Sequence, residues 1–297
     1  ALIAVSMSAS LFVTYAGADS AYQIRINTAE SKREVSEDLF GVNFDWIING
    51  KNYVTDYDGN DFSPNMLVKS SLNEIAPPVI RLGEDASTKI SWKDTIGDYS
   101  ERPEKTLWGY TGAIKFGLVE QIKYWQSINP DASFTFTVNP YENVSDIADL
   151  AEFLSGDETT EWGKKRIAAG IEKPVDIKAY QLGNEQDWTD KLSADEYLSY
   201  AKPAIEAIKS RDAAAKIAVI GGTSMYNQYL KGTYDDSFMT GVVSGLKNDV
   251  DYVAFNWYMA WNRQDILNEL LDKVSNSLDS IGATNVKIFL SEIACAS

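Results

Sequence analysis

Two glutamates each follow a short apolar run: Glu185 comes after Ile177–Leu182, and Glu292 comes after Val286–Leu290. Apolar runs of this length, bounded by turn residues, are typical of strands that are buried in a parallel sheet. If both strands belong to one barrel, both carboxyl groups lie at its C-terminal face, where functional residues gather. Two facing carboxyl groups in different environments can divide into a protonated acid and an ionised nucleophile. The pattern therefore favours a protonated acid/base and an ionised nucleophile, with the two roles divided between Glu185 and Glu292.

The composition removes most rival mechanisms. The chain has 297 residues and no histidine, and its one cysteine is Cys295. These counts exclude a Ser-His-Asp triad, a Cys-His dyad and a histidine-ligated metal site, so we expect neither a metal nor another cofactor. The formal net charge of −16 argues against nucleic acid and anionic membranes as partners, and it suits a neutral or cationic ligand. Acid/base work at neutral pH then falls to carboxylates, tyrosine or lysine.

Polar residues follow most of the other predicted strands as well. Any one of them could be an ordinary turn, cap or ion pair, but the set as a whole accompanies the two glutamates. Arg81 and the Tyr258 hydroxyl group would stabilise an ionised Glu292, and Asn184 could bind the 2-hydroxyl group of a sugar. A carboxyl pair with such neighbours suits retaining hydrolysis of a glycosidic bond. The predicted substrate-binding residues are Asp45, Arg81, Asn139, Asn184, Asn256, Trp257 and Tyr258.

Strands and helices alternate along the chain. The predicted strands are Leu39–Phe44, Pro78–Leu82, Phe134–Val138, Ile177–Leu182, Ile217–Ile220, Tyr252–Phe255 and Val286–Leu290. The predicted helices are Ala113–Ile128, Ser145–Leu154, Ser193–Ile208 (which opens with a Ser193/Glu196 capping box) and Asp265–Ile281. Such alternation implies an α/β fold with a parallel sheet. Because no glycine-rich phosphate loop follows the first strand, the pattern favours a (β/α)8 TIM barrel, truncated before strand 8, over a doubly wound sheet.

The N-terminal stretch reads differently from the rest. Residues 1–18 carry no charge and end in Ala16-Gly17-Ala18, which predicts part of a secretory signal peptide. Residues 19–36 are expected to form a short N-terminal β segment, which could belong to an accessory β-sandwich. Residues 37–297 are expected to form the catalytic barrel. A removed signal peptide implies a secreted or periplasmic protein, with no membrane association after cleavage.

The motifs resemble those of a known family. The segment Tyr180–Trp188, YQLGNEQDW, is similar to the Gly-Asn-Glu acid/base motif of clan A, a large group of retaining glycoside hydrolases with barrel folds. Within that clan the likeness is greatest to the family 51 α-L-arabinofuranosidases. Further similar segments are FGVNFDW, VIRLGED, TVNPYENVSDIADLAEFLSG, WGKKRIAAG, VDYVAFNWY and KIFLSEIA. The resemblance implies a TIM-barrel α-L-arabinofuranosidase that acts on plant-type polysaccharide side chains. Carried over by position, it makes Glu185 the acid/base and Glu292 the nucleophile.

The chain departs from the family pattern at three places. Asn256 stands where a histidine is usual, and Asp45 stands where a glutamate is common. After Arg81, Leu82-Gly83-Glu84 replaces the expected Pro-Gly-Gly. These changes alter the walls expected to hold the sugar and leave the carboxylate pair intact. A retaining glycoside hydrolase acting on an oligo- or polysaccharide is therefore indicated more firmly than any particular sugar.

Two alternatives remain open at this point. One is an endo-β-glycanase, similar to a cellulase or xylanase, in which Trp92 and Trp108 act as stacking platforms on long insertions. The other is a non-catalytic carbohydrate-binding barrel. The size of the products distinguishes an endo-acting from an exo-acting enzyme. Turnover of any glycoside would exclude the non-catalytic barrel.

Overall fold

A computed structural model of the protein describes residues 36–45, 53–58, 61–260 and 266–296. The chain divides into two units, Ala1–Leu39 and Phe40–Ser297. The described part of the first unit begins a short 3-10 helix, η1 (Glu37–Phe40). The predicted signal peptide (1–18) and nearly all of the predicted N-terminal β segment (19–36) lie outside the described residues.

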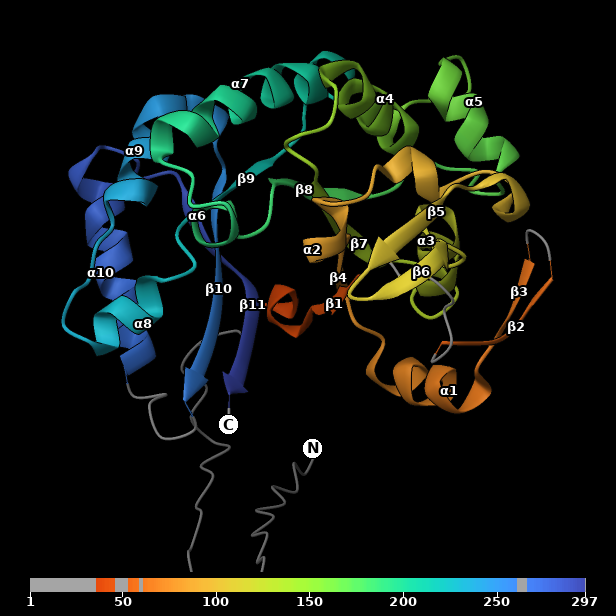
Figure 1. Ribbon diagram of the computed structural model, residues 1–297, viewed down its shortest axis with the longest axis horizontal. Coiled ribbons are helices and arrows are strands. Elements are labelled where there is room, and N and C mark those ends of the chain that lie inside the picture. Colours follow the sequence, from red (N-terminus) through yellow and green to blue (C-terminus); the bar gives the residue numbers. More distant parts are fainter. Residues whose placement is uncertain (1–35, 46–52, 59–60, 261–265, 297) are drawn as a thin grey trace, which may run out of the picture. The chain divides into compact units, whose positions relative to one another are not determined.

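Seven parallel strands form the centre of the second unit. They are β1 (Val42–Phe44), β4 (Val79–Leu82), β7 (Ser133–Val138), β8 (Ile177–Leu182), β9 (Ile217–Ile220), β10 (Tyr252–Ala260) and β11 (Lys287–Ala296). Each strand pairs in parallel with the next along the chain, in the order β1-β4-β7-β8-β9-β10-β11. A doubly wound sheet would reverse this order partway, whereas a barrel keeps it. The prediction of a (β/α) barrel lacking its eighth strand is confirmed: the described strands make a nearly closed barrel, without pairing between β11 and β1 (Figure 1).

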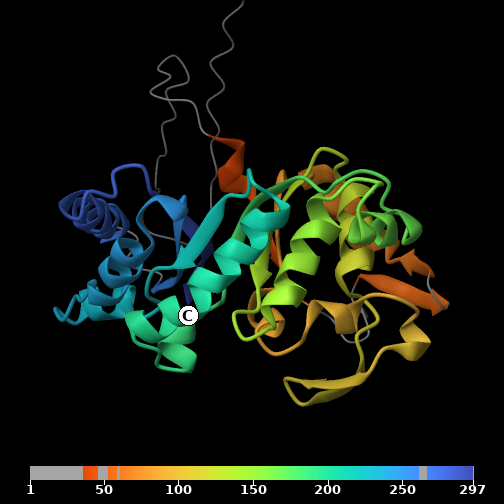
Figure 2. The same ribbon diagram turned by 90° about the horizontal axis from the view of Figure 1, so that it is seen from above.

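Helices surround this sheet. The longer ones are α1 (Met66–Ile75), α3 (Leu118–Gln126), α4 (Val144–Ser155), α5 (Glu161–Ala168), α7 (Ala194–Arg211), α9 (Ser237–Leu246) and α10 (Ile266–Ser280). Helix α4 packs between α5 and α7, and α7 packs on α9 (Figure 2). The predicted capping box is present at α7, because the Ser193 amide donates to Glu196 Oε2 at 2.8 Å and the Glu196 amide donates to Ser193 Oγ. Of the helices that the structure describes, none has the length and apolar character needed to cross a bilayer.

The strand interiors form one apolar core with the helices. Ile80, Phe134, Tyr180, Ile217 and Val253 come from five neighbouring strands, and all of them are fully buried. Such strands are covered on both faces, which explains why they read as nearly continuous apolar runs in the sequence. The core therefore fixes the strand ends, and with them the residues that follow.

Two predicted elements differ at the N-terminal half of the barrel. The strand expected over Leu39–Phe44 is shorter, because η1 occupies its first residues and only Val42–Phe44 pairs with β4. The helix expected from Ala113 begins at Leu118 instead. The residues before it form a β-hairpin, with β5 (Glu104–Leu107) paired antiparallel to β6 (Tyr110–Ala113). A second hairpin joins β2 (Val54–Asp58) to β3 (Asp61–Pro64).

Strands β10 and β11 extend well past their predicted ends at Phe255 and Leu290. They stay paired to Ala260 and Ala296, but the register shifts after Phe255: Phe255 lies opposite Leu290, and Asn256 lies opposite Glu292. Ser291 is therefore an extra residue, as in a β-bulge, which re-aims the side chains that follow it. This irregularity brings Asn256 level with Glu292, inside the strands rather than beyond them.

Candidate active site

Arg81 connects three strands at the C-terminal face of the barrel. It lies in β4, and only 2% of its surface is exposed. Its Nε donates to Gln181 Oε1 at 2.9 Å, its Nη2 to Asn184 Oδ1 at 2.7 Å, and its Nη1 to Glu292 Oε1 at 2.9 Å. Bonds between a guanidinium and a carboxylate are short and strong because both partners are charged. The arginine thereby fixes the position of Glu292 relative to β4 and β8.

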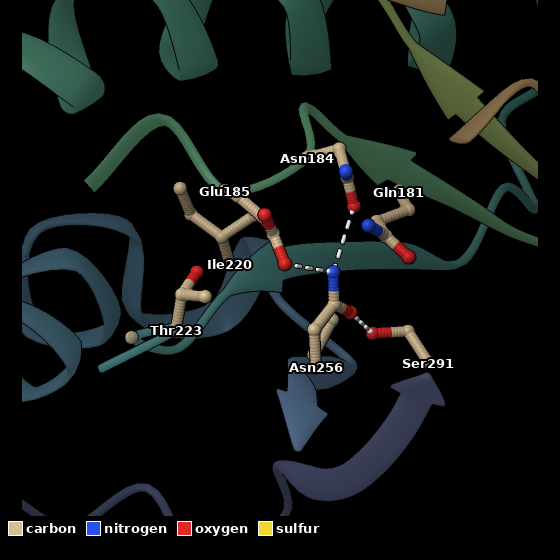
Figure 3. Close-up of a pocket in the computed structure, with 9 residues that line it drawn as sticks. Gln181, Asn184, Glu185, Ile220, Thr223, Asn256 and Ser291 are labelled. Atoms are coloured by element: carbon tan, nitrogen blue, oxygen red, sulfur yellow. Dashed lines mark hydrogen bonds between the residues drawn. The ribbon is translucent and has the colours of Figure 1, made fainter. Parts of the chain in front are cut away.

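Asn256 makes the second connection, from β10 to β8. Its Nδ2 donates to Asn184 Oδ1 at 3.0 Å and to Glu185 Oε1 at 2.9 Å (Figure 3). The orientation of this amide is set by the Ser291 hydroxyl group, which donates to Asn256 Oδ1 at 2.7 Å. Since Asn184 Oδ1 accepts from both Arg81 and Asn256, a continuous series of hydrogen bonds runs from Glu292 to Glu185.

The two glutamates lie in different surroundings. Glu292 accepts from the Arg81 guanidinium and from the Tyr258 hydroxyl group, both of which stabilise its ionised form. Glu185 accepts from the neutral amide of Asn256. Burial raises the pKa of Glu185 and the charge of Glu292 raises it further, while the Asn256 hydrogen bond lowers it. Burial also raises the pKa of Tyr258, as does its bond to Glu292, so this hydroxyl group remains a donor at neutral pH. The geometry suits a protonated Glu185 beside an ionised Glu292.

The backbone at Glu185 is unusual. Its φ of +65° lies in the left-handed region, which residues other than glycine and asparagine rarely adopt. From there the chain turns into the short helix α6 (Gln186–Thr189), whose Trp188 and Thr189 amides donate to the Glu185 carbonyl. Strained residues of this kind persist only where their surroundings hold them, and they gather at functional sites. Here the turn directs the carboxyl group toward Asn256.

A cavity of about 250 Å³ opens beside Glu185. Trp188, with 59% of its surface exposed, lies on its wall. The remaining lining residues are Thr223, Ser224, Tyr226, Asn227, Asn256 and Tyr258. A much smaller space of about 10 Å³, between Glu185, Ser291 and their neighbours, has room for roughly one water molecule (Figure 3).

No residue after β9 is among the predicted substrate-binding residues, although two polar side chains there line the larger cavity. Thr223 and Ser224 follow Gly221-Gly222 there, and both line the larger cavity. The Asp187 carboxylate holds this segment by accepting from the Thr223 amide at 2.8 Å and from its hydroxyl group at 3.0 Å. The sequence offered one signal for these site residues, namely two hydroxyl side chains directly after a pair of glycines.

Two other predicted substrate-binding residues bond to backbone amides. The Asp45 carboxylate accepts from the Ala86 amide at 3.3 Å, within the short helical turn after β4. Asn139 Oδ1 accepts from the Tyr141 amide at 3.0 Å within the turn after β7.

Trp257 lies in the core and is not brought to the site. None of its surface is exposed, and its ring packs on Phe255 at a centroid distance of 4.7 Å. The reason is the alternation of side chains along a strand: Asn256 and Tyr258 share one face of β10, so Trp257 points to the other. Trp92, considered above as a stacking platform, is likewise buried, whereas Trp108 is exposed on the β5–β6 hairpin.

Comparison with known proteins identifies relatives of this chain. Residues 71–257 match the family model described as "Alpha-L-arabinofuranosidase 1 domain". An intracellular exo-alpha-(1->5)-L-arabinofuranosidase of Bifidobacterium longum is 24% identical over 207 residues, covering 68% of this chain and 35% of that protein. A protein of that name from Bacillus subtilis (strain 168) is 24% identical over 218 residues, covering 71% of this chain and 42% of that protein. The chain thus spans less than half the length of these curated relatives.

Solved structures show the same fold. A family 51 alpha-L-arabinofuranosidase from Bifidobacterium longum superposes with a TM-score of 0.69 at 20% identity, over 87% of this chain and 55% of that chain. The GH51 arabinofuranosidase from Xanthomonas axonopodis pv. citri gives a TM-score of 0.70 at 19% identity, over 88% and 58% of the two chains.

These relatives also correct one prediction. The sequence analysis predicted a secreted or periplasmic protein, but the curated relatives named above are called intracellular enzymes. The prediction of secretion is contradicted by them. It rested on residues 1–18 alone, where an uncharged apolar stretch was read as a signal peptide.

The family model spans well over half of the chain, including the segments that carry Arg81, Glu185 and Asn256. The resemblance to family 51 that the motifs indicated is confirmed, and the strand order and barrel agree with it. The chain belongs to the alpha-L-arabinofuranosidase 1 domain family.

Proposed function

We propose that this barrel hydrolyses α-L-arabinofuranosides with retention of configuration, with Glu292 as the nucleophile and Glu185 as the acid/base. One observation carries the proposal: a single series of hydrogen bonds, through Arg81, Asn184 and Asn256, joins the two carboxyl groups while giving them opposite surroundings. A pair whose environments separate their protonation states is what the two roles require.

In the first step, Glu185 gives its proton to the oxygen of the leaving group while Glu292 attacks the anomeric carbon. The glycosidic bond breaks, and an ester forms between the sugar and Glu292. The ester carries no charge, so one of the groups that raise the pKa of Glu185 is lost at this stage. Glu185 is then better able to act as a base. It takes a proton from water while the water oxygen attacks the anomeric carbon and breaks the bond to Glu292. The sugar is released, Glu292 is again a carboxylate, and Glu185 is again protonated.

Three neighbours support these steps. Arg81 and the Tyr258 hydroxyl group each hold one oxygen of Glu292, which orients the carboxylate for attack. Asn256 holds Glu185 from the side of β10, where the family usually has a histidine. An asparagine amide donates without titrating, so the acid/base keeps one neutral partner at every working pH.

The substrate class follows from the relatives rather than from the pocket alone. Curated relatives carry the name exo-alpha-(1->5)-L-arabinofuranosidase, and we propose that this protein likewise releases arabinofuranose units from plant-type polysaccharide side chains. An endo-acting β-glycanase is the competing proposal, supported by the exposed rings of Trp108 and Trp188. Product size decides between them: an exo-acting enzyme releases a monosaccharide, and an endo-acting enzyme releases shorter oligomers.

The roles can be tested by azide rescue in the full-length protein. An aryl α-L-arabinofuranoside with a good leaving group is hydrolysed by the wild type, and NMR of the first product should show retained configuration. Glu292→Gly with azide should give a glycosyl azide of inverted configuration, because azide replaces the nucleophile. Glu185→Gly with azide should give an azide of retained configuration, because azide attacks the ester instead of water. Inversion by the wild type would contradict the role of Glu292, and the absence of turnover on a panel of aryl glycosides would favour a sugar-binding barrel.

A further inference from the structure

Glu84 stands in a segment where this chain departs from the family motif, three residues after Arg81. It opens the short helix α2 (Glu84–Ser87) with a φ of +33°, directly after Gly83 with a φ of +93°. Backbone bonds hold this turn, since the Gly83 amide donates to the Phe44 carbonyl at 3.1 Å and the Ser87 amide donates to the Gly83 carbonyl at 2.7 Å. A glutamate in a backbone conformation that disfavours it is therefore held firmly over the end of β4.

The Glu84 carboxyl group lies beside the nucleophile. Its Oε1 is 4.0 Å from Arg81 Nη1, the same nitrogen that donates to Glu292 at 2.9 Å. Its side chain keeps 20% of its surface exposed, compared with 11% for Glu292. Within the described part of the chain, this carboxyl group has the long ion pair with Arg81 but no hydrogen bond. A mostly buried polar group without a bond is costly, so it offers an open position for a ligand.

The charges around Glu84 decide its protonation. Burial raises its pKa to about 7; Arg81 lowers it, and Glu292 and Asp85 raise it. Tyr53 also faces this group, since the charge of Glu84 contributes to the raised pKa of the tyrosine. Near neutral pH the carboxyl group is therefore protonated in a large part of the molecules. It can then donate a hydrogen bond as well as accept one.

We propose that Glu84 is a specificity-determining residue that binds one hydroxyl group of the sugar ring attacked by Glu292. The inference rests on the proposed function and adds a contact to it. A ring held against Glu292 brings its hydroxyl groups near Arg81, and the Glu84 carboxyl group, 4.0 Å from the Arg81 nitrogen that holds Glu292, has an unused hydrogen-bonding position there. Glu84 thus supplies a side-chain contact. The glycine at this position of the family's Pro-Gly-Gly segment has no side chain that could make it.

The test combines one substitution with substrates that each lack one hydroxyl group. Glu84→Ala and the wild type are compared, in the full-length protein, on an aryl α-L-arabinofuranoside and on its 2-, 3- and 5-deoxy analogues. We expect kcat/KM of Glu84→Ala to fall about 10- to 100-fold on the parent substrate, as when a site loses a bond to a substrate hydroxyl group. On one of the three analogues the fall should be less than about 3-fold, because the bond is already absent there. Equal losses on all four substrates would overturn the proposal, since a structural or purely electrostatic role predicts them.

Two further variants sharpen the experiment. Glu84→Gln keeps the shape of the side chain and can still donate and accept, so it should stay within about 5-fold of the wild type on every substrate. Glu101→Gln removes an exposed carboxyl group on the same inter-strand segment and should change none of the four values. A wild type that turns over no arabinofuranoside would overturn the proposed function together with this contact. A wild type that is active, with a uniform loss in Glu84→Ala, would overturn the contact alone.

Discussion

Two largely buried arginine–glutamate pairs in the described part of the barrel, Arg102–Glu120 and Arg81–Glu292, differ in their other partners. Arg102 donates to Glu120 at 2.7 Å, and its remaining donors reach the carbonyl oxygens of Gly97 and Ile114. Glu120 in turn accepts from the Gly117 amide at 3.0 Å, where α3 begins. Because these partners are backbone groups, the pair fastens a loop to the first turn of a helix.

The Arg81–Glu292 pair has side chains as its partners instead. Arg81 reaches Gln181 and Asn184, and the second oxygen of Glu292 reaches the exposed Tyr258. Tyr258 lines the larger cavity beside Glu185 and Asn184 lines the smaller one, whereas the other partners of Arg102 are backbone groups of the fold. We propose that a buried arginine–glutamate pair fixes structure where its partners are backbone groups and supports chemistry where they are side chains. It is most informative to test the two pairs by matched substitutions.

The largest difference is expected between the two glutamates. Glu292→Ala should lower kcat by about 10⁴-fold or more, because the nucleophile is lost. It should leave the fold intact, because Arg81 keeps Gln181 and Asn184 as partners and Glu84 as a counter-charge. Glu120→Ala should leave kcat of the folded protein nearly unchanged. It should lower the free energy of unfolding by about 3–5 kcal/mol, because Arg102 would remain buried without its counter-charge. Turnover of an aryl arabinofuranoside and denaturant-induced unfolding measure the two effects, and a Glu120→Ala protein with wild-type stability would break the comparison.

The two arginines should repeat the contrast at smaller scale. Arg81→Met should lower kcat/KM by about 10²- to 10³-fold, a typical loss when a preorganised donor is removed from an active site. Arg102→Met should change kcat/KM of the folded protein by less than about 3-fold and should lower the melting temperature. Melting curves recorded beside the kinetics separate the two outcomes. If Arg81→Met lost stability and activity in the same proportion as Arg102→Met, the distinction between the pairs would fail.

Glu84 adds a second carboxyl group to the Arg81–Glu292 pair, which should make stability depend on pH. Its pKa is raised in the folded state from 4.5 to about 7, so the unfolded chain ionises first. Stability is therefore fully present below about 4.5 and falls as the pH rises toward about 7. Glu84→Gln should remove this loss. Between pH 4 and pH 8, its free energy of unfolding should fall less than that of the wild type, by on the order of 2 kcal/mol.

Denaturant unfolding of Glu84→Gln and of the wild type at the two pH values gives this difference directly. The exposed Glu101→Gln serves as the control and should show the same stability change with pH as the wild type. A Glu84→Gln protein that gained nothing at pH 8 would argue that Glu84 is not destabilised by its surroundings when ionised.

The smallest effect concerns Asn256, which lowers the pKa of Glu185 through its hydrogen bond. Glu185 must be protonated in the first step, so kcat/KM should fall as the pH rises through its pKa. Asn256→Ala removes the bond, raises the pKa further and should move this alkaline limb to higher pH. The rate at the optimum should fall by about 10-fold, the net worth of one hydrogen bond. Ser291→Ala, which contacts Asn256 but not Glu185, should move the limb less. If the alkaline limb of Asn256→Ala moved to lower pH, Asn256 could not be lowering the pKa of Glu185.

Much of the fold could be read from single segments. The bounds of two strands, Ile177–Leu182 and Ile217–Ile220, were predicted residue for residue. A strand that is buried on both faces is a mostly apolar segment, and polar or turn residues flank it. Helix α7 was announced by Ser193 and Glu196, whose side chains bond locally. By contrast, the ends of β10 and β11 depend on pairing with each other, and the register shift after Phe255 cannot be seen in either segment alone.

The residue types of the site and the order of the elements that carry them could be predicted from the amino-acid sequence. Without histidine, a strand-end glutamate pair was left as the means of acid/base chemistry, and the motifs around it indicated the family. The partner of each carboxyl group, in contrast, depends on how the strands come together in space. Arg81 meets Glu292 across 211 positions of sequence and Asn184 across 103, and Trp257 turns into the core while Tyr258 turns toward Glu292. The reason is physical: protonation and hydrogen bonding depend on distances of a few ångströms between atoms from different strands, and those distances exist only once the barrel has formed.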